Sequence, residues 1–233
     1  MPIGAARLNT LSRRFAPLIF RPKTVTAQGS AVVSTAQNRF GGASASFTGA
    51  NGTYLTVTPS SDFARGTGNF TLEYWVRPTN LNSCVHFDTR PAGNSNATAI
   101  TMFYSGSALT YYSGGAVRIT GVALSTGVWT HIALTRSGND HRLYINGTQR
   151  GSTYTASQDI NTVSSAISIG ANSDGPGTLA LNGFIDEIRF SNNVRYTANF
   201  TSPTAAFTND ANTILLLHCN GTNGSTSFPD DNA

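Results

Sequence analysis

Three carboxylates lie on stretches that we predict to be strands, and any acid–base chemistry would have to start from them. Hydrolysis of a glycosidic bond needs two carboxyl groups, about 5–5.5 Å apart for retention and roughly 6.5–9.5 Å apart for inversion. On one strand this requires acids at positions i and i+2 or i+4, because alternate side chains share a face. Glu73 has no acidic neighbour at such a spacing, and the adjacent Asp186 and Glu187 are predicted to point to opposite faces. The sequence therefore predicts no catalytic residue, and we expect a protein that is not an enzyme.

Histidine and cysteine do not form a zinc pattern. A zinc site takes three or four His, Cys or carboxylate ligands, usually at short spacings. Cys84 and Cys219 stand far apart, each among apolar residues, and both are expected to be small buried side chains. A disulfide between them remains an open alternative. The four histidines lie on four separate predicted strands: His86, His131, His141 and His218.

Aromatic side chains are the residues that could hold a sugar ring, provided that they are exposed beside polar donors. Tyr111 and Tyr112 precede a Gly-Gly pair, and we expect them to form an exposed patch on a loop. Trp75 and Trp129 are further candidates for glycan binding, although a tryptophan on a strand is more typical of packing.

The elements that must position these residues are strands. From about residue 31, short β-prone runs alternate with turn signals such as Asn146-Gly147, which favours a two-residue hairpin. No amphipathic helix is visible, so the sequence predicts an all-β antiparallel sandwich. Strands are predicted at residues 44–47, 53–58, 69–77, 83–87, 97–104, 109–112, 117–120, 128–136, 141–146, 166–169, 184–190 and 213–219.

Side-chain alternation predicts which face of two strands points inward. Phe70, Leu72, Tyr74 and Val76 share one face of their strand. In the run 184–190, the same alternation places Asp186 on the face of Phe184, Ile188 and Phe190. An acid on an apolar face must be hydrogen-bonded or paired, because its burial otherwise costs several kcal/mol.

Composition and charge divide the chain into two parts. Only 11% of the residues are charged and 39% are hydrophobic, which is typical of a globular protein rather than a disordered one. No apolar run approaches the roughly 18 residues of a membrane-spanning helix. Residues 1–61 hold six basic residues and no acid, a net charge of +6, whereas the other nine basic and eleven acidic residues give −2.

This basic stretch predicts an N-terminal docking arm, residues 1–28, that binds another protein. Packing of the arm against its own domain and a role as a targeting leader are alternatives. Nonspecific phosphate contacts are a further alternative, but no specific nucleic-acid partner is expected, because the arm lacks interleaved basic and aromatic residues. The side chains expected to bind the partner are Arg7, Arg13, Arg14, Phe15, Arg21 and Lys23.

Read in order, five stretches resemble laminin-G-like domains of the concanavalin A-like lectin/glucanase superfamily, of the type found in structural proteins of tailed bacteriophages. They include WTHIALTRSGNDHRLYING at 129–147 and LNGFIDEIRF at 181–190. The resemblance implies a jelly-roll of two antiparallel sheets with about twelve to fourteen strands. We expect an arm at 1–28, a sandwich at 29–220 and a short tail at 221–233. The five stretches that carry the resemblance are residues 30–57, 61–78, 129–147, 181–207 and 213–228.

The resemblance also bears on metal binding and on the last strand. Many laminin-G-like domains bind calcium at the rim of the sandwich through loop oxygens. Asp174 is a weak candidate here, with an acid that bonds to its own turn as the alternative; no other cofactor is expected. The segment 213–228 closes the chain, and we expect it to complete its own sheet rather than to pair with a neighbouring copy.

The function that these observations favour is that of a non-enzymatic structural protein of a bacteriophage virion. The sandwich would be displayed on the particle surface, in several copies, on the capsid or the tail, and the arm would bind other virion proteins. A glycan-binding adhesin for the host surface is the alternative. A polysaccharide hydrolase is the third class, which lacks the paired carboxylates that it needs. No membrane partner is expected.

Overall fold

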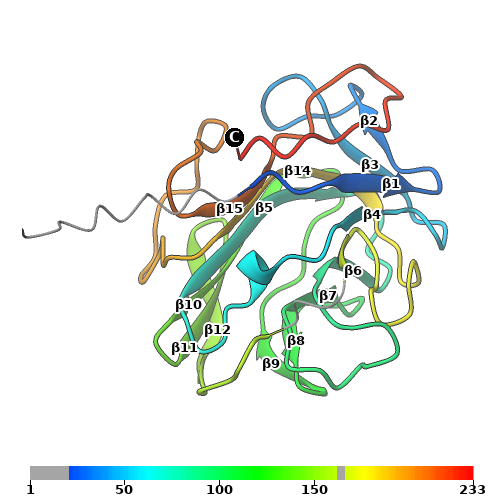
Figure 1. The fold of residues 1–233 in the computed structure, drawn as a ribbon. Helices are drawn as coiled ribbons and strands as arrows, with labels where there is room; N and C mark the ends of the chain where they lie inside the picture. The colour runs from blue at the N-terminus through cyan, green and yellow to red at the C-terminus, as the bar shows by residue number, and fades with distance from the viewer. Residues whose placement is uncertain (1–20, 162–165, 233) are drawn as a thin grey trace, which may run out of the picture.

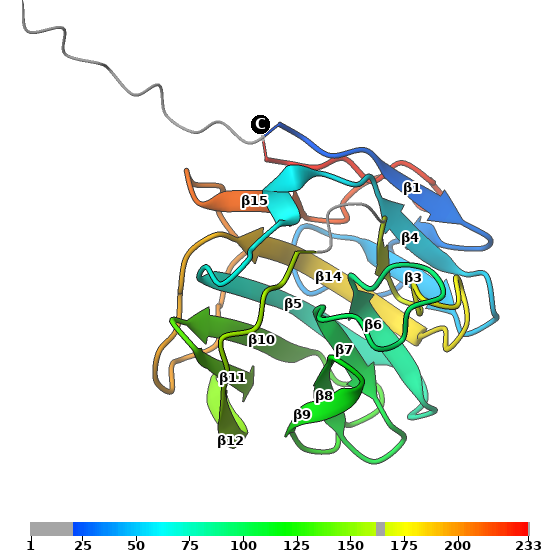
Figure 2. The ribbon, with the colours of Figure 1, turned by 60° about the horizontal axis from the view of Figure 1, so that its bottom comes forward.

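The computed structural model describes residues 21–161 and 166–232 and shows a sandwich of two antiparallel sheets (Figures 1 and 2). The prediction of an all-β fold is confirmed. Fifteen strands and a single 3-10 turn, η1 (Ser61–Phe63), make up the regular structure of the described residues. None of the described segments is a helix with the length and apolar character that crossing a membrane requires.

One sheet has seven strands, and its order brings together segments from both halves of the chain. β13 lies between β4 and β6, so residues near 168 are neighbours of residues near 56 and 88. In spatial order the strands are β1 (Val25–Gln28), β4 (Tyr54–Val57), β13 (Ile167–Ile169), β6 (Cys84–Asp88), β7 (Thr101–Tyr104), β8 (Leu109–Ser113) and β9 (Ala116–Thr120).

The other sheet has eight strands, of which the ten-residue β14 (Asn182–Ser191) is the longest. β14 pairs with β5 along one side, and on its other side first with β3 and then with β15. The remaining strands are β12 (Thr148–Thr155), β11 (Asp140–Ile145), β10 (Thr130–Ser137), β5 (Phe70–Pro78), β3 (Ser44–Thr48), β2 (Val32–Ser34) and β15 (Thr213–Leu217).

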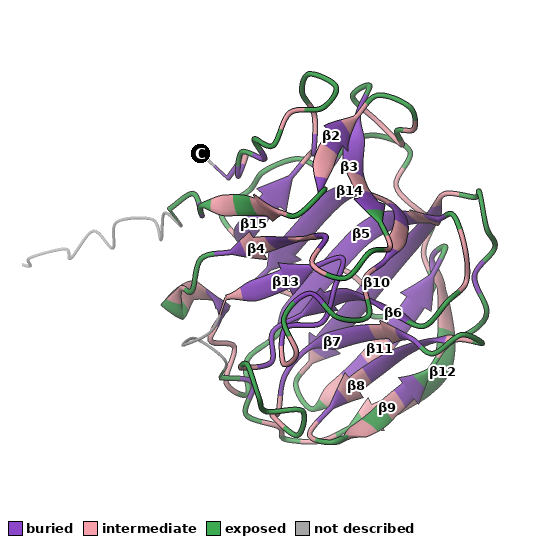
Figure 3. Cartoon of the chain, turned by 90° about the vertical axis from the view of Figure 1, so that its right-hand side faces the viewer, coloured by how far each residue is buried: buried purple, intermediate pink, exposed green. Residues whose placement is uncertain are grey.

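The core lies between the sheets, and β5 contributes the face that alternation predicts. Phe70, Leu72, Tyr74 and Val76 are all buried in it. Cys84 and Cys219 are buried free thiols, and burial raises the pKa of Cys84 to about 12. The central strands β5, β10 and β14 are buried along most of their length (Figure 3), which means that the eight-stranded sheet is covered on its outer face as well.

A β-bulge in β14 overturns the predicted orientation of its acids. Asp186 pairs with Trp75 and Arg189 pairs with Glu73, which leaves two residues of β14 opposite one residue of β5. Glu187 adopts a left-handed backbone conformation there, with φ of 53°. A bulge of this kind resets which residues face inward. The prediction that Asp186 shares a face with Ile188 and Phe190 is therefore wrong, and Asp186 and Glu187 both lie on the outer face.

Both ends of the described chain are part of the sandwich. Val25–Gln28 pairs with β4, so these residues lie in the seven-stranded sheet rather than in a separate arm. The tail after residue 220 also packs on the domain, since Asp230 accepts hydrogen bonds from the amides of Lys23 and Leu216. β15 pairs with β14 of its own chain, as expected. Figure 2 shows the C-terminal segment running beside β1.

Candidate functional site

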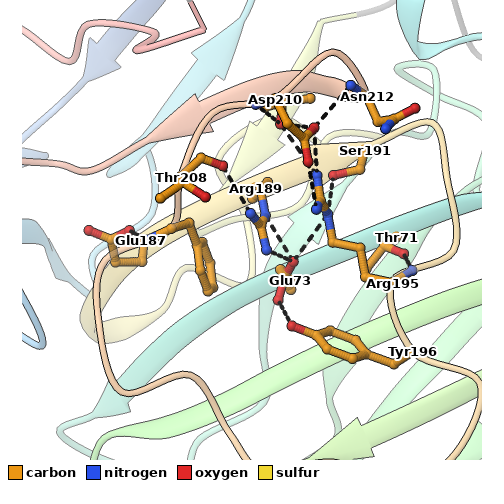
Figure 4. Close-up of polar contacts among 12 residues, drawn as sticks. Thr71, Glu73, Glu187, Arg189, Ser191, Arg195, Tyr196, Thr208, Asp210 and Asn212 are labelled. Carbon is orange, nitrogen blue, oxygen red and sulfur yellow. Dashed lines mark hydrogen bonds and ion pairs between the residues drawn. The ribbon is translucent and has the colours of Figure 1, made fainter.

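The outer face of the eight-stranded sheet holds a buried carboxylate centre at Glu73 (Figure 4). Arg189 donates to Glu73 Oε1 from Nη2 at 2.7 Å and from Nε at 2.9 Å, and the Tyr196 hydroxyl donates to Oε2 at 2.8 Å. His131 Nε2 lies 3.3 Å from the same Oε2. Burial alone would raise the pKa of Glu73, but His131 and the charge of Arg189 outweigh it and lower that pKa. The carboxylate is thus held ionised inside the protein.

The segment 192–212, which we call the covering segment, closes over this centre. The backbone amide of Arg195 donates a hydrogen bond to the Thr71 hydroxyl of β5. The Arg195 guanidinium forms two 3.0 Å hydrogen bonds with the Asp210 carboxylate. Glu187 accepts a hydrogen bond from the amide of Phe207 at 2.7 Å. The covering segment is therefore fastened at both ends to side chains of the sheet.

The three buried acids on this face each hold covering chain in place. Glu73, Asp186 and Glu187 are all fully buried beneath covering chain. Asp186 accepts from the amides of Arg39 and Phe40, and Glu187 is held by His218 as well as by Phe207. Each carboxylate is engaged in fixing a loop to the sheet, which is a structural role.

The four aromatic residues predicted to bind a glycan are placed very differently. Trp75 is buried beneath Arg39, whose guanidinium lies 4.1 Å from the indole ring, and Trp129 is half-buried against the same cluster. Tyr111 is fully buried in the core, stacked against a histidine. The expectation that Tyr111 is exposed on a loop is wrong, because it lies in β8 and points inward. Tyr112 alone of the four lies half-buried on the outer face of the seven-stranded sheet.

Tyr112 belongs to a row of side chains that crosses the seven-stranded sheet. Directly opposite residues of antiparallel strands point to the same face. The register pairs Tyr112 with Thr101, Thr101 with Asp88, and Asp88 with Ser168. Polar and aromatic side chains from four strands therefore meet on this face.

Arg90 packs against this row through Asp88. It follows β6 and folds back on Asp88, to which Nε donates at 3.0 Å and Nη2 at 2.8 Å. Nη2 also donates to the Asn172 side-chain oxygen, and Nη1 to Asp174 Oδ2 at 3.2 Å. Burial by itself would lower the pKa of Arg90, but the hydrogen bond and charge of Asp88 and the charge of Asp174 raise it. The guanidinium stays positively charged between two acids.

A pocket of about 250 Å³ opens beside this cluster, and we call it the Arg90 pocket. The half-buried rings of Phe103 and Tyr112 line its apolar side, and Arg90 lies 5.4 Å from the Tyr112 ring centroid. Arg90, Asn172 and Asp174 line its polar side. Asp174 Oδ1 is buried and has no hydrogen-bond partner among the described residues. An apolar surface with a few convergent polar groups is typical of a site for a small ligand.

Leu179 forms one wall of the pocket in a strained conformation. Its φ is 51°, which is rare for a bulky residue, and its side chain is 40% exposed. Strain of this kind costs about 1–3 kcal/mol and is concentrated at functional sites.

Two larger hollows adjoin the Arg90 pocket. One, of about 520 Å³, shares Leu179 with it and is lined by side chains that include Asn51, Asn80 and Asn82. The other, of about 290 Å³, shares Arg90 with it and is lined by Tyr54 and Ser168, among others. The Arg90 pocket thus shares one lining residue with each of the other two hollows.

The structure joins two sequence candidates and adds residues that the sequence did not indicate. Tyr112 and Asp174 line the same pocket, although 62 positions separate them. Arg90, Asp88 and Phe103 were missed, and the only available signal was an acid at the end of an apolar strand. Asp174, the weak calcium candidate, is instead paired with Arg90. Within the described residues, no three His, Cys, Asp or Glu side chains form a group that could hold a metal ion.

Of the six residues predicted to bind a partner through the arm, the structure describes only the last two. Arg7, Arg13, Arg14 and Phe15 lie outside the described residues. Arg21 is exposed, whereas Lys23 is buried and its Nζ pairs with Asp62 at 2.8 Å. Lys23 therefore fastens the start of the described chain to the sandwich.

Comparison with protein families gives a match over more than half of the chain. The profile described as the concanavalin A-like lectin/glucanases superfamily matches residues 48–199. This stretch includes β4 to β14, and with them all the residues of the Arg90 pocket. A search of curated protein sequences gives no significant match.

Solved structures share the fold at low sequence identity. Domain 4 of AbnA, an extracellular arabinanase from Geobacillus stearothermophilus solved with arabinotriose, has a TM-score of 0.56 at 19% identity, over 75% of this chain and 84% of that one. The enzymatically active domain of tailspike protein 2 of bacteriophage CBA120 has a TM-score of 0.55 at 13% identity, over 88% of this chain and 34% of that one. The botulinum neurotoxin serotype G binding domain has 0.54 at 12%, over 75% and 44%. The chain thus spans less than half the length of each of the last two structures.

Proposed function

Because the chain belongs to the concanavalin A-like lectin/glucanases superfamily, we propose that it is a non-enzymatic module that binds glycans in the Arg90 pocket. The observation that carries the proposal is the pocket itself. Half-buried Phe103 and Tyr112 lie beside a buried carboxylate oxygen of Asp174 that has no partner. A sugar ring presents an apolar face for stacking and hydroxyl groups that need such acceptors.

Other observations support the same role. Two of the four large hydrophobic side chains that are exposed among the described residues adjoin this surface: Leu179 lines the pocket, and Val117 pairs with Tyr112. Domain 4 of AbnA, which has this fold, was solved in complex with arabinotriose. The three acids on the opposite face are buried and engaged in holding loops, which supports binding rather than hydrolysis.

The test is a glycan array followed by titration of the strongest ligand. Tyr112→Ala removes the stacking surface, and we expect it to weaken binding at least tenfold while the domain stays folded. Tyr111→Phe is the matched control, because it changes the neighbouring tyrosine, which is fully buried in the core. A blank array, or equal affinities for Tyr112→Ala and the unchanged protein, would reject the proposal.

We further propose that this module is a structural subunit of a bacteriophage particle, displayed on the virion surface and attached by its basic N-terminus. The specific support is the charge distribution: the first 61 residues carry +6 and no acid, whereas the rest is nearly neutral. The enzymatically active domain of a phage tailspike protein shares the fold. Binding of host-surface glycans by a particle of this kind would unite the two roles.

Removal of residues 1–20 tests the attachment. This truncation leaves β1 and Lys23 in place, so the sandwich should fold with an unchanged melting temperature. We expect it to be missing from assembled particles and to retain its glycan affinity. Normal incorporation of the truncated protein would contradict the attachment role and leave the glycan proposal standing.

A further inference from the structure

The Arg90 pocket and the two hollows that adjoin it carry little charge of their own. Of all the residues that line the three, only Arg90 and Asp174 are charged. Asp88 lies directly behind Arg90 and adds a second negative charge. One guanidinium between two carboxylates leaves the centre of the surface with a net charge of −1.

Arg90 would be the natural partner for an acidic sugar, yet its donors are already used. A guanidinium has five N–H donors and grips a carboxylate best with two of them in parallel. Asp88 takes one from Nε and one from Nη2, Asn172 takes the other from Nη2, and Asp174 takes one from Nη1. One donor remains, so the two-point grip on a ligand carboxylate is not available.

Asp174 adds a direct penalty for an anion. Asp174 lines the pocket, and its Oδ1 has no hydrogen-bond partner among the described residues, so a hydroxyl group of a ligand is a suitable donor for this carboxylate. A hydroxyl group supplies that donor, whereas a carboxylate or sulfate places a second negative charge beside it. Two like charges in a partly buried site repel much more strongly than in water.

The adjoining hollows have the chemistry of sugar hydroxyl groups. The hollow beyond Leu179 is lined by the side-chain amides of Asn51, Asn80 and Asn82, and each amide both donates and accepts. The hollow beyond Arg90 adds Tyr54 and Ser168. Because the Arg90 pocket shares Leu179 with one of these hollows and Arg90 with the other, we call the three together the track.

From this arrangement we infer that the track binds neutral glycan chains of two or more sugars and rejects the same chains when they carry carboxylate or sulfate groups. The inference rests on the proposed glycan-binding function and specifies its ligand class. Arg90 acts here as a positioning residue, which orients Asp174 and Tyr112 rather than gripping the ligand.

The experiment uses an array on which neutral oligosaccharides are printed beside their uronate, sialylated or sulfated counterparts. At low salt we expect binding to the neutral member of a pair, with at least tenfold weaker binding to the anionic one. Asp174→Asn should reduce this ratio to less than threefold. Asp159→Asn is the matched control, because Asp159 is exposed and lines none of the hollows. Screening by 0.5 M salt should narrow the ratio in the unchanged protein.

Two further variants test the expected preference for glycan chains over single sugars. Tyr54→Ala and Asn82→Ala alter the outer hollows alone, so each should weaken a bound trisaccharide at least threefold and leave the corresponding monosaccharide unaffected.

Equal or tighter binding of the anionic partners would overturn the inference and leave the proposed function intact. Equal affinities for monosaccharide and trisaccharide would overturn the chain-length part. An array without any binding would reject the proposed function, and the inference with it.

Discussion

Each outer face of this sandwich has an arginine–carboxylate centre, but only one of them is open. On the eight-stranded sheet, Glu73 and Arg189 lie beneath the covering segment. On the seven-stranded sheet, Asp88 and Arg90 border a pocket. The two centres share their chemistry, since in both a fully buried carboxylate holds an arginine through two hydrogen bonds.

What distinguishes the two faces is what lies over each centre. At Glu73, both carboxylate oxygens have partners, one of which comes from the covering segment itself. At Arg90, the half-buried rings of Phe103 and Tyr112 line a pocket together with Asp174. The comparison teaches that a charge cluster does not by itself identify a binding site, because only the centre that borders a hollow can meet a ligand.

The largest expected effect is that of breaking the sealed centre. Glu73→Gln removes the negative charge that compensates Arg189, and we expect a loss of about 3–5 kcal/mol in the free energy of unfolding. Chemical denaturation measures it. Asp210→Asn is the control on the same face, because its side chain is 40% exposed, and it should cost at most about 1 kcal/mol. Similar losses for both variants would show that Glu73 does not hold this face together.

A smaller loss of stability is expected from a substitution at Gly147, which lies against the Phe200 carbonyl of the covering segment. A Cβ atom at this position would lie 1.9 Å from the carbonyl oxygen of Phe200, and φ is +75°. Gly147→Ala should therefore displace the covering segment in addition to incurring the roughly 1–2 kcal/mol strain of a left-handed alanine. Gly138→Ala, with φ of +59° and open space around it, incurs the strain alone.

The melting temperatures of these two glycine variants measure the difference. Both should keep the glycan affinity of the unchanged protein, because they lie outside the Arg90 pocket. A loss of affinity in Gly147→Ala would mean that the two faces are coupled, and equal melting temperatures would mean that the covering segment yields without cost.

The sealed face should also show a pH dependence of its stability, spread over several pH units. Burial raises the pKa of Asp186 from an ordinary value near 4 to about 7. Between these values the folded protein holds a proton that the unfolded chain has lost. The free energy of unfolding should therefore fall as pH rises from 4 to 7, by up to about 1.4 kcal/mol per pH unit. Denaturation curves across this range should show a flatter dependence for Asp186→Asn, and an unchanged slope would contradict the assignment.

His218 should act in the same direction at slightly higher pH. Its hydrogen bond to Glu187 raises the pKa of His218, so the pair stabilises the fold fully below about pH 6.5 and is lost as pH rises through the folded pKa. His218→Gln should remove the part of the slope that lies above pH 6.5.

The sequence by itself determined the all-β fold, the inward face of β5 and the separation of a basic N-terminus from a nearly neutral body. Period-two alternation and turn residues are local signals, so they are legible without coordinates. It also indicated Tyr112 and Asp174, but without any link between them.

Only the tertiary structure decided which residues meet. Alternation places Asp186 and Ile188 on the same face, but the bulge at Glu187 leaves Asp186 on the outer face and Ile188 in the core, because one extra residue reverses every side chain beyond it. The Arg90 pocket joins three strands to a loop some 80 residues away, and β13 brings that loop there by pairing beside β6. Contacts of this range depend on strand order, which the alternation of side chains within each strand does not encode.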